Sequence, residues 1–240
     1  MLMIVLLTDF GIHDPYIGQI HLRLSVLAPA VPVIDLFHGL PDFAIEAAAY
    51  LLPAYCRHVP PGAVIMGVVD PGVGGSRRAI AFKADGRYYV GPDNGLFEMV
   101  ARRAGVDTGL PLAIPPDAAA SFHGRDVFAP AAATLACGGS LGDLQVPLTR
   151  FLEWPDEGYK ILYIDHYGNA ITGVRARLEH RTLTVRGRTL MRAHTFGDRP
   201  DGEPFFYENA NGLIEIAAYG RSAAAALNLH LADPLVVTSG

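Results

Sequence analysis

The residues Asp70–Arg78 read Asp-Pro-Gly-Val-Gly-Gly-Ser-Arg-Arg and directly follow an apolar run. Proline fixes φ and lacks an N–H, whereas glycines accept positive φ, so this segment predicts a sharp turn with exposed backbone. It places the Asp70 carboxylate and the permanently cationic Arg77 at the two ends of one turn. Such a turn offers charge and close backbone approach to a ligand. The alternative is a tight surface turn with solvated arginines.

Further polar side chains follow other predicted strands. Asp9 ends the first strand, His123 precedes an alanine-rich helix, and Asp165 and Asn169 leave a later strand. Each has an ordinary structural interpretation, because aspartate and asparagine favour Asx turns and a histidine can cap a helix. Their recurrence at the ends of separate strands favours a ligand site, since open α/β sheets bind ligands there.

The established fingerprints of nucleotide and acyl-transfer sites do not fit the glycine turn. A dinucleotide-binding motif needs glycine where Arg77 stands, and a phosphate-binding loop needs Gly-Lys-Ser/Thr where Gly75-Ser76-Arg77 stands. Ser76 lacks the second glycine of a nucleophile elbow. A zinc site using His123 and Asp70 remains an alternative, but the nine histidines form no HExxH motif, and no metal is expected.

Strands alternate with helices in the first part of the chain, which predicts parallel pairing and a three-layer α/β sandwich. The expected strands are 3–7, 31–37, 63–69, 79–83 and 88–90, the last two joined as a hairpin at Asp85-Gly86. The expected helices are 16–27, 43–50 with a kink or end near Pro53, a short one reaching 104, and 127–137.

Beyond residue 147 the periodicity changes to short strands separated by turn signals, which predicts an all-β domain. These strands are expected at 159–164, 183–185, 188–190, 205–207, 213–216 and 235–237. The predicted organisation is an α/β fold with an N-terminal three-layer sandwich and mainly parallel sheet at 1–147, a linker at 148–157, and a smaller, barrel-like β domain at 158–240.

Composition restricts the partners. Half of the 240 residues are apolar, 18% are charged, the net charge is −5, and the mean hydropathy is +0.25. Without a basic run, neither nucleic acid nor an anionic membrane surface is an expected partner. No apolar run is long enough for a membrane span. Cys56 and Cys137 form no metal or disulfide pattern, so a reducing cytoplasm is the expected location.

Together these motifs resemble the S-adenosyl-L-methionine (SAM) hydroxide adenosyltransferases, or adenosine-forming SAM hydrolases, which are relatives of fluorinases and chlorinases. The resemblance covers nearly the whole chain. It rests on Thr8-Asp-Phe-Gly11, Asp70-Pro-Gly-Val-Gly74 with Arg77-Arg78, Pro92-Asp-Asn-Gly95, Phe122-His-Gly-Arg-Asp126, Asp165 with Asn169, and Leu213-Ile-Glu-Ile-Ala217.

The resemblance implies hydrolysis of SAM at C5′ to adenosine and methionine, without a cofactor, in a homotrimer whose site lies between subunits. The catalytic set carries over to Asp70, Arg77 and His123. Arg77 would stabilise hydroxide, and either Asp70 or His123 would take the proton from water. The three retained residues favour hydroxide over halide.

Substrate contacts carry over in the same way. Asp9 would bind the ribose hydroxyls and Phe43 would line the adenosine pocket. Asp165 and Asn169 would hold the methionine amino end or the ribose, and the segments containing Asn211 and Ala217 would meet adenine, largely through backbone. The sequence departs from the family at Gly173, Asn211 and Tyr219, which affects the expected contact to the methionine carboxylate.

Three other functions compete with SAM hydrolysis. They are a SAM-dependent halogenase, a SAM- or adenosine-binding module without turnover, and a metal-dependent phosphoester hydrolase. The first is disfavoured by Asp70 and His123, and the second by the presence of a complete water-activating set.

Overall fold

The computed structural model describes residues 2–239. The chain divides into two compact units, Met1–Glu153 (unit 1) and Trp154–Gly240 (unit 2). The boundary between the two units, after Glu153, lies within the segment expected as a linker, 148–157. The predicted domain bounds of 1–147 and 158–240 stay a prediction. Across residues 2–239, no helix is both long and apolar enough to cross a membrane.

Unit 1 is built on one seven-stranded sheet with the order β2-β1-β3-β5-β4-β6-β7. Its strands are β1 (Ile4–Thr8), β2 (Val33–Phe37), β3 (Val64–Val68), β4 (Ala79–Ala84), β5 (Arg87–Pro92), β6 (Thr108–Pro111) and β7 (Val146–Pro147). Neighbours among β2, β1, β3 and β5 pair parallel, and β4 pairs antiparallel to β5 as the predicted hairpin. Because β6 is antiparallel to β4, it again runs in the direction of β5. The predicted α/β fold with a mainly parallel sheet is confirmed.

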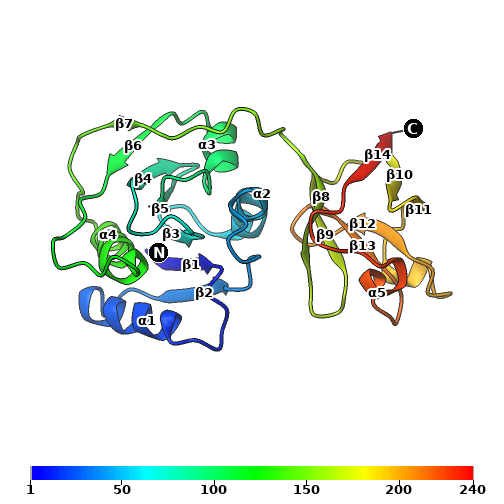
Figure 1. Cartoon of the computed structure of the whole chain (residues 1–240), viewed down its shortest axis with the longest axis horizontal. Helices are drawn as coiled ribbons and strands as arrows, with labels where there is room; N and C mark the ends of the chain where they lie inside the picture. Colours follow the sequence, from blue (N-terminus) through cyan, green and yellow to red (C-terminus); the bar gives the residue numbers. More distant parts are fainter. Residues whose placement is uncertain (1, 240) are drawn as a thin grey trace. The chain divides into compact units, whose positions relative to one another are not determined.

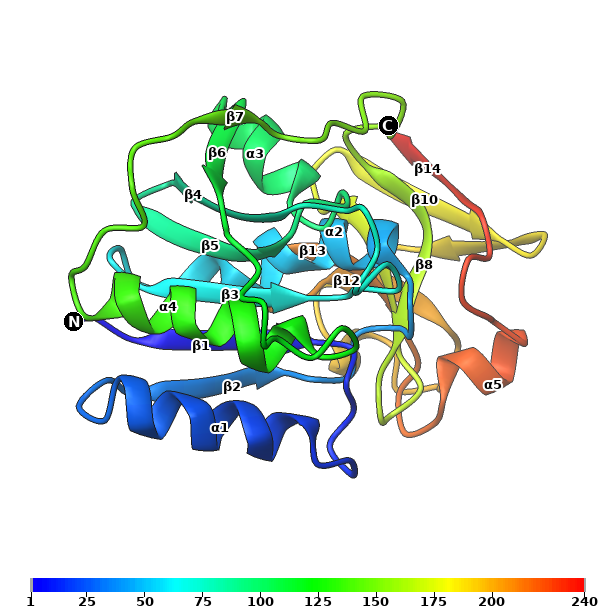
Figure 2. The same cartoon turned by 60° about the vertical axis from the view of Figure 1, so that its left-hand side comes forward.

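Helices cover both faces of this sheet (Figures 1 and 2). They are α1 (Tyr16–Leu27), α2 (Ile45–Tyr55), α3 (Glu98–Ala104) and α4 (Ala129–Ala136). Side chains of α1 and α4 form one core cluster with Leu6 of β1 and Met66 of β3. On the opposite face, Gly67 of β3 lies against Leu52 of α2 and Phe97, which precedes α3. The alternation of β3 residues between these cores produces the predicted three layers.

Several element bounds differ from the sequence prediction. Helix α2 begins at Ile45 rather than residue 43, because Phe43 has a φ of 60°, which a helix does not allow. The same helix passes through Pro53 and ends at Tyr55. The last helix of unit 1 is preceded by a π-helical segment, η2 (Gly124–Phe128), that begins directly after His123. Strands β6 and β7 were not predicted.

Unit 2 contains two antiparallel sheets that meet at both edges. The strands are β8 (Gly158–Ile164), β9 (Ala170–Arg175), β10 (His180–Val185), β11 (Arg188–Met191), β12 (Phe205–Glu208), β13 (Leu213–Ala217) and β14 (Leu235–Ser239). They form the orders β11-β10-β14 and β12-β13-β9-β8. Isolated bridges link Lys160 with Pro234 and Arg192 with Phe206, and thereby join the edges of the two sheets. This pairing closes the strands into a ring, as expected of a barrel-like domain.

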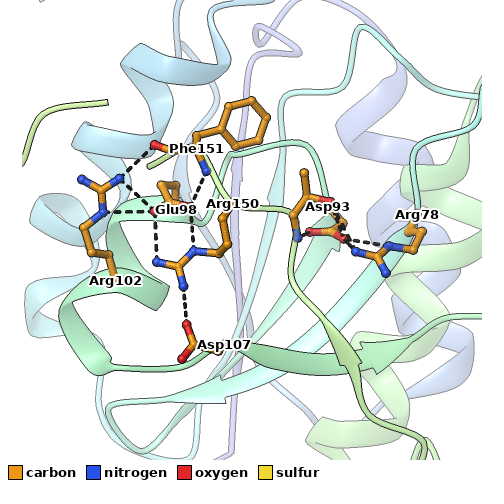
Figure 3. A network of polar contacts seen from close by, with 8 residues as sticks. Arg78, Asp93, Glu98, Arg102, Asp107, Arg150 and Phe151 are labelled. Carbon is orange, nitrogen blue, oxygen red and sulfur yellow. Dashed lines mark hydrogen bonds and ion pairs between the residues drawn. The ribbon is translucent and has the colours of Figure 1, made fainter. Parts of the chain in front are cut away.

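A buried carboxylate fixes the last segment of unit 1 to α3 (Figure 3). The Glu98 side chain is fully buried and accepts hydrogen bonds from Arg102, Arg150 and the backbone N–H of Phe151, at 3.0 to 3.2 Å. Burial alone would raise the pKa of Glu98, but the bonds from Arg150 and Phe151 outweigh it and hold the pKa below its usual value. Glu98 therefore stays ionised and binds the segment that leads to unit 2.

Replacing Glu98 with glutamine should lower the free energy of unfolding of unit 1 by about 2 kcal/mol, because two arginines lose their shared carboxylate. Urea denaturation at neutral pH measures this difference. Since the pKa of Glu98 is lowered by folding, its contribution is present above the unfolded pKa and is lost as the pH falls through the folded pKa. The wild type and the variant should therefore converge in acid. Equal stability at neutral pH would contradict this assignment.

Candidate active site

The turn between β3 and β4 holds a buried ion pair. Nε of Arg77 donates to both carboxylate oxygens of Asp70, at 2.9 and 3.0 Å, and Nη2 donates to Oδ2 as well. The two side chains are only 9% and 5% exposed. A bidentate, nearly dry pair of this kind has a fixed geometry. The turn itself is exposed, as the surface-turn alternative expected, but Arg77 is not solvated, because its guanidinium is bound to Asp70.

A close contact brings this turn to the segment that carries His123. A Cβ on Gly74, whose φ is 75°, would lie 2.5 Å from the carbonyl oxygen of Ala120. Only glycine permits this close contact with Ala120, and Ala120 lies three residues before His123. Nδ1 of His123 is then 2.9 Å from Nη2 of Arg77. The structure thus joins Asp70, Arg77 and His123 into one hydrogen-bonded chain.

The contact with Arg77 determines the tautomer of His123. A guanidinium can only donate, so Nδ1 of His123 accepts and the neutral ring carries its proton on Nε2. Burial, together with the positive charge of Arg77, lowers the pKa of His123 below its ordinary value. His123 is therefore held neutral, with an N–H to donate rather than a lone pair to accept a proton.

A cavity of about 460 Å³ adjoins this chain at the carboxyl ends of β1 and β3. It is lined by Asp9, Phe10, Gly11, Asp14, Tyr16, Asp42, Phe43, Val68, Asp70, Val73, Ser121, Phe122, His123 and Gly124. The described lining contains four aspartates and no lysine or arginine. Arg77 lies behind two of the lining residues, Asp70 and His123, and binds both. Such a lining attracts a cationic ligand.

Asp9 and Phe43 face this cavity together. Oδ2 of Asp9 accepts the backbone N–H of Phe43 at 3.0 Å, and this contact supports the unusual positive φ of Phe43. Phe43 is 72% exposed, so its ring is available for contact with a ligand. Burial raises the pKa of Asp9 despite the hydrogen bond from Phe43. Four of the residues selected from the sequence, Asp9, Phe43, Asp70 and His123, thus line one cavity.

The remaining candidates lie in unit 2. Oδ1 of Asp165 accepts the N–H groups of Tyr167 and Asn169, at 2.9 and 2.8 Å, and Oδ2 accepts Nδ2 of Asn169 at 2.9 Å. This is the Asx turn considered from the sequence. A carboxylate has about four acceptor positions, so Asp165 keeps capacity for a further donor.

The Asn209–Leu213 loop is held by a buried carboxylate that sequence reasoning did not select. Oδ1 of Asn209 accepts the N–H groups of Asn211 and Leu213, and its Nδ2 donates to Glu215 at 3.0 Å. Tyr207 donates its hydroxyl to the other oxygen of Glu215 at 2.8 Å. Asn211 is thus placed by its backbone and keeps its side chain for other contacts.

The Ala217 side chain is fully buried and packs with Phe205. Its neighbour Ala218 lines a hollow of about 510 Å³ together with Asn169, Tyr167 and Phe196. Sequence reasoning did not select Phe196, although a capping box from Thr195 to Asp198 marks the short helix η3 (Phe196–Asp198) that carries it. Any ligand contact of Ala217 therefore involves its backbone.

Comparison with known proteins places these features in a family. Residues 4–145 match the SAM hydroxide adenosyltransferase N-terminal domain, and residues 159–236 match the corresponding C-terminal domain. Proteins named (R)-S-adenosyl-L-methionine hydrolase are similar over nearly the full length of both chains. The Thermus thermophilus protein is 41% identical over 95% of this chain and 96% of its own, and that of Salinispora tropica is 37% identical over 97% and 96%.

More distant relatives and solved structures agree with this placement. A fluorinase from an Actinoplanes species is 23% identical over 98% of this chain and 97% of its own. The crystal structure of an uncharacterized conserved protein from Thermotoga maritima matches with a TM-score of 0.87 and 27% identity, covering 98% of this chain and 99% of that one. The crystal structure of a conserved hypothetical protein from Thermus thermophilus matches with a TM-score of 0.79 and 38% identity, covering 99% and 100%.

Proposed function

Because the chain belongs to the SAM hydroxide adenosyltransferase family, we propose that it hydrolyses SAM by attack of water on C5′. The new bond joins the water oxygen to C5′, while the C5′–S bond breaks and its electron pair passes to sulfur. The products are adenosine, methionine and one proton. The observation that carries this proposal is the Asp70–Arg77–His123 chain at an acidic cavity.

The proposed reaction needs an activated nucleophile more than an acid, because methionine leaves as a neutral thioether. Nη1 of Arg77 is buried and has no hydrogen-bond partner among the described residues, and a bound water or hydroxide would satisfy it. Nε2–H of His123 would donate to the same oxygen. Since neutral His123 has no free lone pair, we assign proton acceptance to Asp70.

The acidic lining supports the choice of substrate. SAM carries a sulfonium and an ammonium group, both of which the lining aspartates other than the Arg77-bound Asp70 would attract. We assign the ribose hydroxyls to Asp9 and the face of the nucleoside to Phe43, whose backbone N–H donates to Asp9. Attack by hydroxide on a sulfonium cancels opposite charges, so the low exposure of Asp70 and Arg77 also suits the reaction.

Unit 2 would supply the remaining contacts. We assign the methionine amino group or the ribose to Asp165 with Asn169, and adenine to the Asn211 loop and the backbone at Ala217. Phe196 offers an aromatic face beside Asn169.

We further propose that the protein is a cytoplasmic homotrimer in which unit 2 of one copy completes the site of a neighbour. Exposed apolar side chains on α1 and β2 support self-association; they are Leu22, Val26, Ile34 and Leu36. Light scattering during gel filtration should give the mass of three chains. The mass of a single chain at micromolar concentration would contradict the trimer.

Product analysis tests the proposed activity. Chelator-treated and untreated protein are each incubated separately with the two sulfonium epimers of SAM, since the relatives are named for the (R) form. Each reaction is run with and without chloride. We expect equal amounts of adenosine and methionine, independent of chelator and chloride. A 5′-chloro product would indicate a halogenase, unchanged but bound SAM a binding module, and loss of activity with chelator a metal-dependent hydrolase.

A further inference from the structure

Asp93 and Asn94, which follow β5, hold both ends of the turn that carries Asp70 and Arg77. Nδ2 of Asn94 donates to the carbonyl of Val69, the residue before Asp70, at 2.9 Å. The backbone N–H of Asp93 donates to the carbonyl of Arg78, the residue after Arg77, at 2.9 Å. Strand β5 lies between β3 and β4 in the sheet, so its end adjoins both ends of the turn.

The side chain of Asp93 binds Arg78 a second time (Figure 3). Nε and Nη2 of Arg78 donate to Oδ2 of Asp93, at 3.0 and 2.6 Å, and the Asp93 side chain is only 4% exposed. Thr149 donates to Asp93 from its backbone N–H and its hydroxyl, at 2.9 and 3.0 Å. Nη2 of Arg78 also donates to the carbonyl of Pro147 at 2.6 Å. The two adjacent arginines thus have separate carboxylate partners, Asp70 for Arg77 and Asp93 for Arg78.

We propose that Asp93 and Asn94 are positioning residues that set the placement of Asp70 and Arg77 for the reaction, an inference that rests on the proposed function. They act through the turn rather than on the substrate, because Asp93 lines a separate small hollow with Glu98 and Thr149. Misplacing a reacting group by about 1 Å can cost about 100-fold in rate, so small movements of the turn matter.

The test compares Asp93→Asn and Asn94→Ala with Glu98→Gln, which disrupts a neighbouring buried network away from the turn. We expect the first two variants to lower kcat by about 10- to 100-fold with KM within about twofold of wild type. Glu98→Gln should lose at least as much thermal stability yet keep kcat within about twofold. Equal losses of kcat in all three variants would overturn the proposal. If Asp93→Asn does not fold, Arg78→Lys tests the same contact.

A second readout does not depend on turnover. The charge of Arg77 contributes to the low pKa of His123, so displacement of Arg77 should raise this pKa. NMR titration of the free protein should show the rise in Asp93→Asn but not in Glu98→Gln. An unchanged pKa of His123 in Asp93→Asn would overturn the positioning role. If the wild type fails to cleave SAM but the pKa still rises, the positioning role is supported and the proposed function alone fails.

Discussion

Replacing Arg77 with methionine is expected to lower kcat by about 1,000-fold, because in the proposed mechanism the hydroxide would lose the cationic side chain that stabilises it. Stability should fall at the same time by about 3 kcal/mol, since the buried Asp70 carboxylate loses its bidentate partner. Steady-state kinetics and urea denaturation measure the two effects.

A double variant separates the catalytic loss from the loss of stability. Changing Asp70 to leucine together with Arg77 to methionine removes both charges, which should recover most of the stability. Activity should stay at least as low as in Arg77→Met, because the cation and the proton acceptor are then both missing. Recovery of turnover together with stability would contradict the assignment of Asp70 and Arg77, since it would make their role purely structural.

His123 should govern the acid limb of the pH profile. Burial and the charge of Arg77 lower the pKa of His123 from its ordinary value of about 6.5. In the folded protein the ring therefore remains neutral at pH values somewhat below 6.5. Activity should fall only as the pH drops through this lower, folded value. The contribution of neutral His123 to the free energy of unfolding depends on pH in the same direction as activity. It is fully present above the pKa of His123 in the unfolded chain and is lost as the pH falls through the pKa in the folded protein.

Two substitutions of His123 distinguish hydrogen bonding from proton transfer. Glutamine can accept from Arg77 and donate into the cavity as the neutral ring does, but it does not titrate. We expect His123→Gln to keep most activity and lose the acid limb, and His123→Ala to lose about 100-fold in kcat. An unchanged acid limb in His123→Gln would show that another group controls it.

Local chemistry made part of the site predictable. Asp70 and Arg77 belong to one short segment whose proline and glycines favour a sharp turn, so their proximity could be inferred. Asp9 and Asp70 meet because the parallel strands β1 and β3 are adjacent, with Thr8 opposite Val68. The association of His123 with this pair depends on the contact of Gly74 with Ala120, which no spacing in the sequence reveals.

Tertiary contacts explain what the sequence prediction missed. Phe43 leaves the helical region because its N–H binds Asp9, a residue 34 positions earlier in the chain. Strand β9 was not predicted because its residues are buried on both faces, which removes the alternation of polar and apolar positions. Within β9, a Cβ on Gly173 would lie 2.8 Å from the backbone of Gly158, which accounts for glycine at this position.

Oxygen labelling tests the central claim, direct attack of water on C5′. Enzyme in excess over SAM is mixed in oxygen-18 water, so that each molecule turns over once, and the adenosine is analysed by mass spectrometry. Direct attack predicts one heavy oxygen at the 5′ position in the first turnover. Unlabelled adenosine would contradict it, because the 5′ oxygen would then have come from a protein carboxylate such as Asp70.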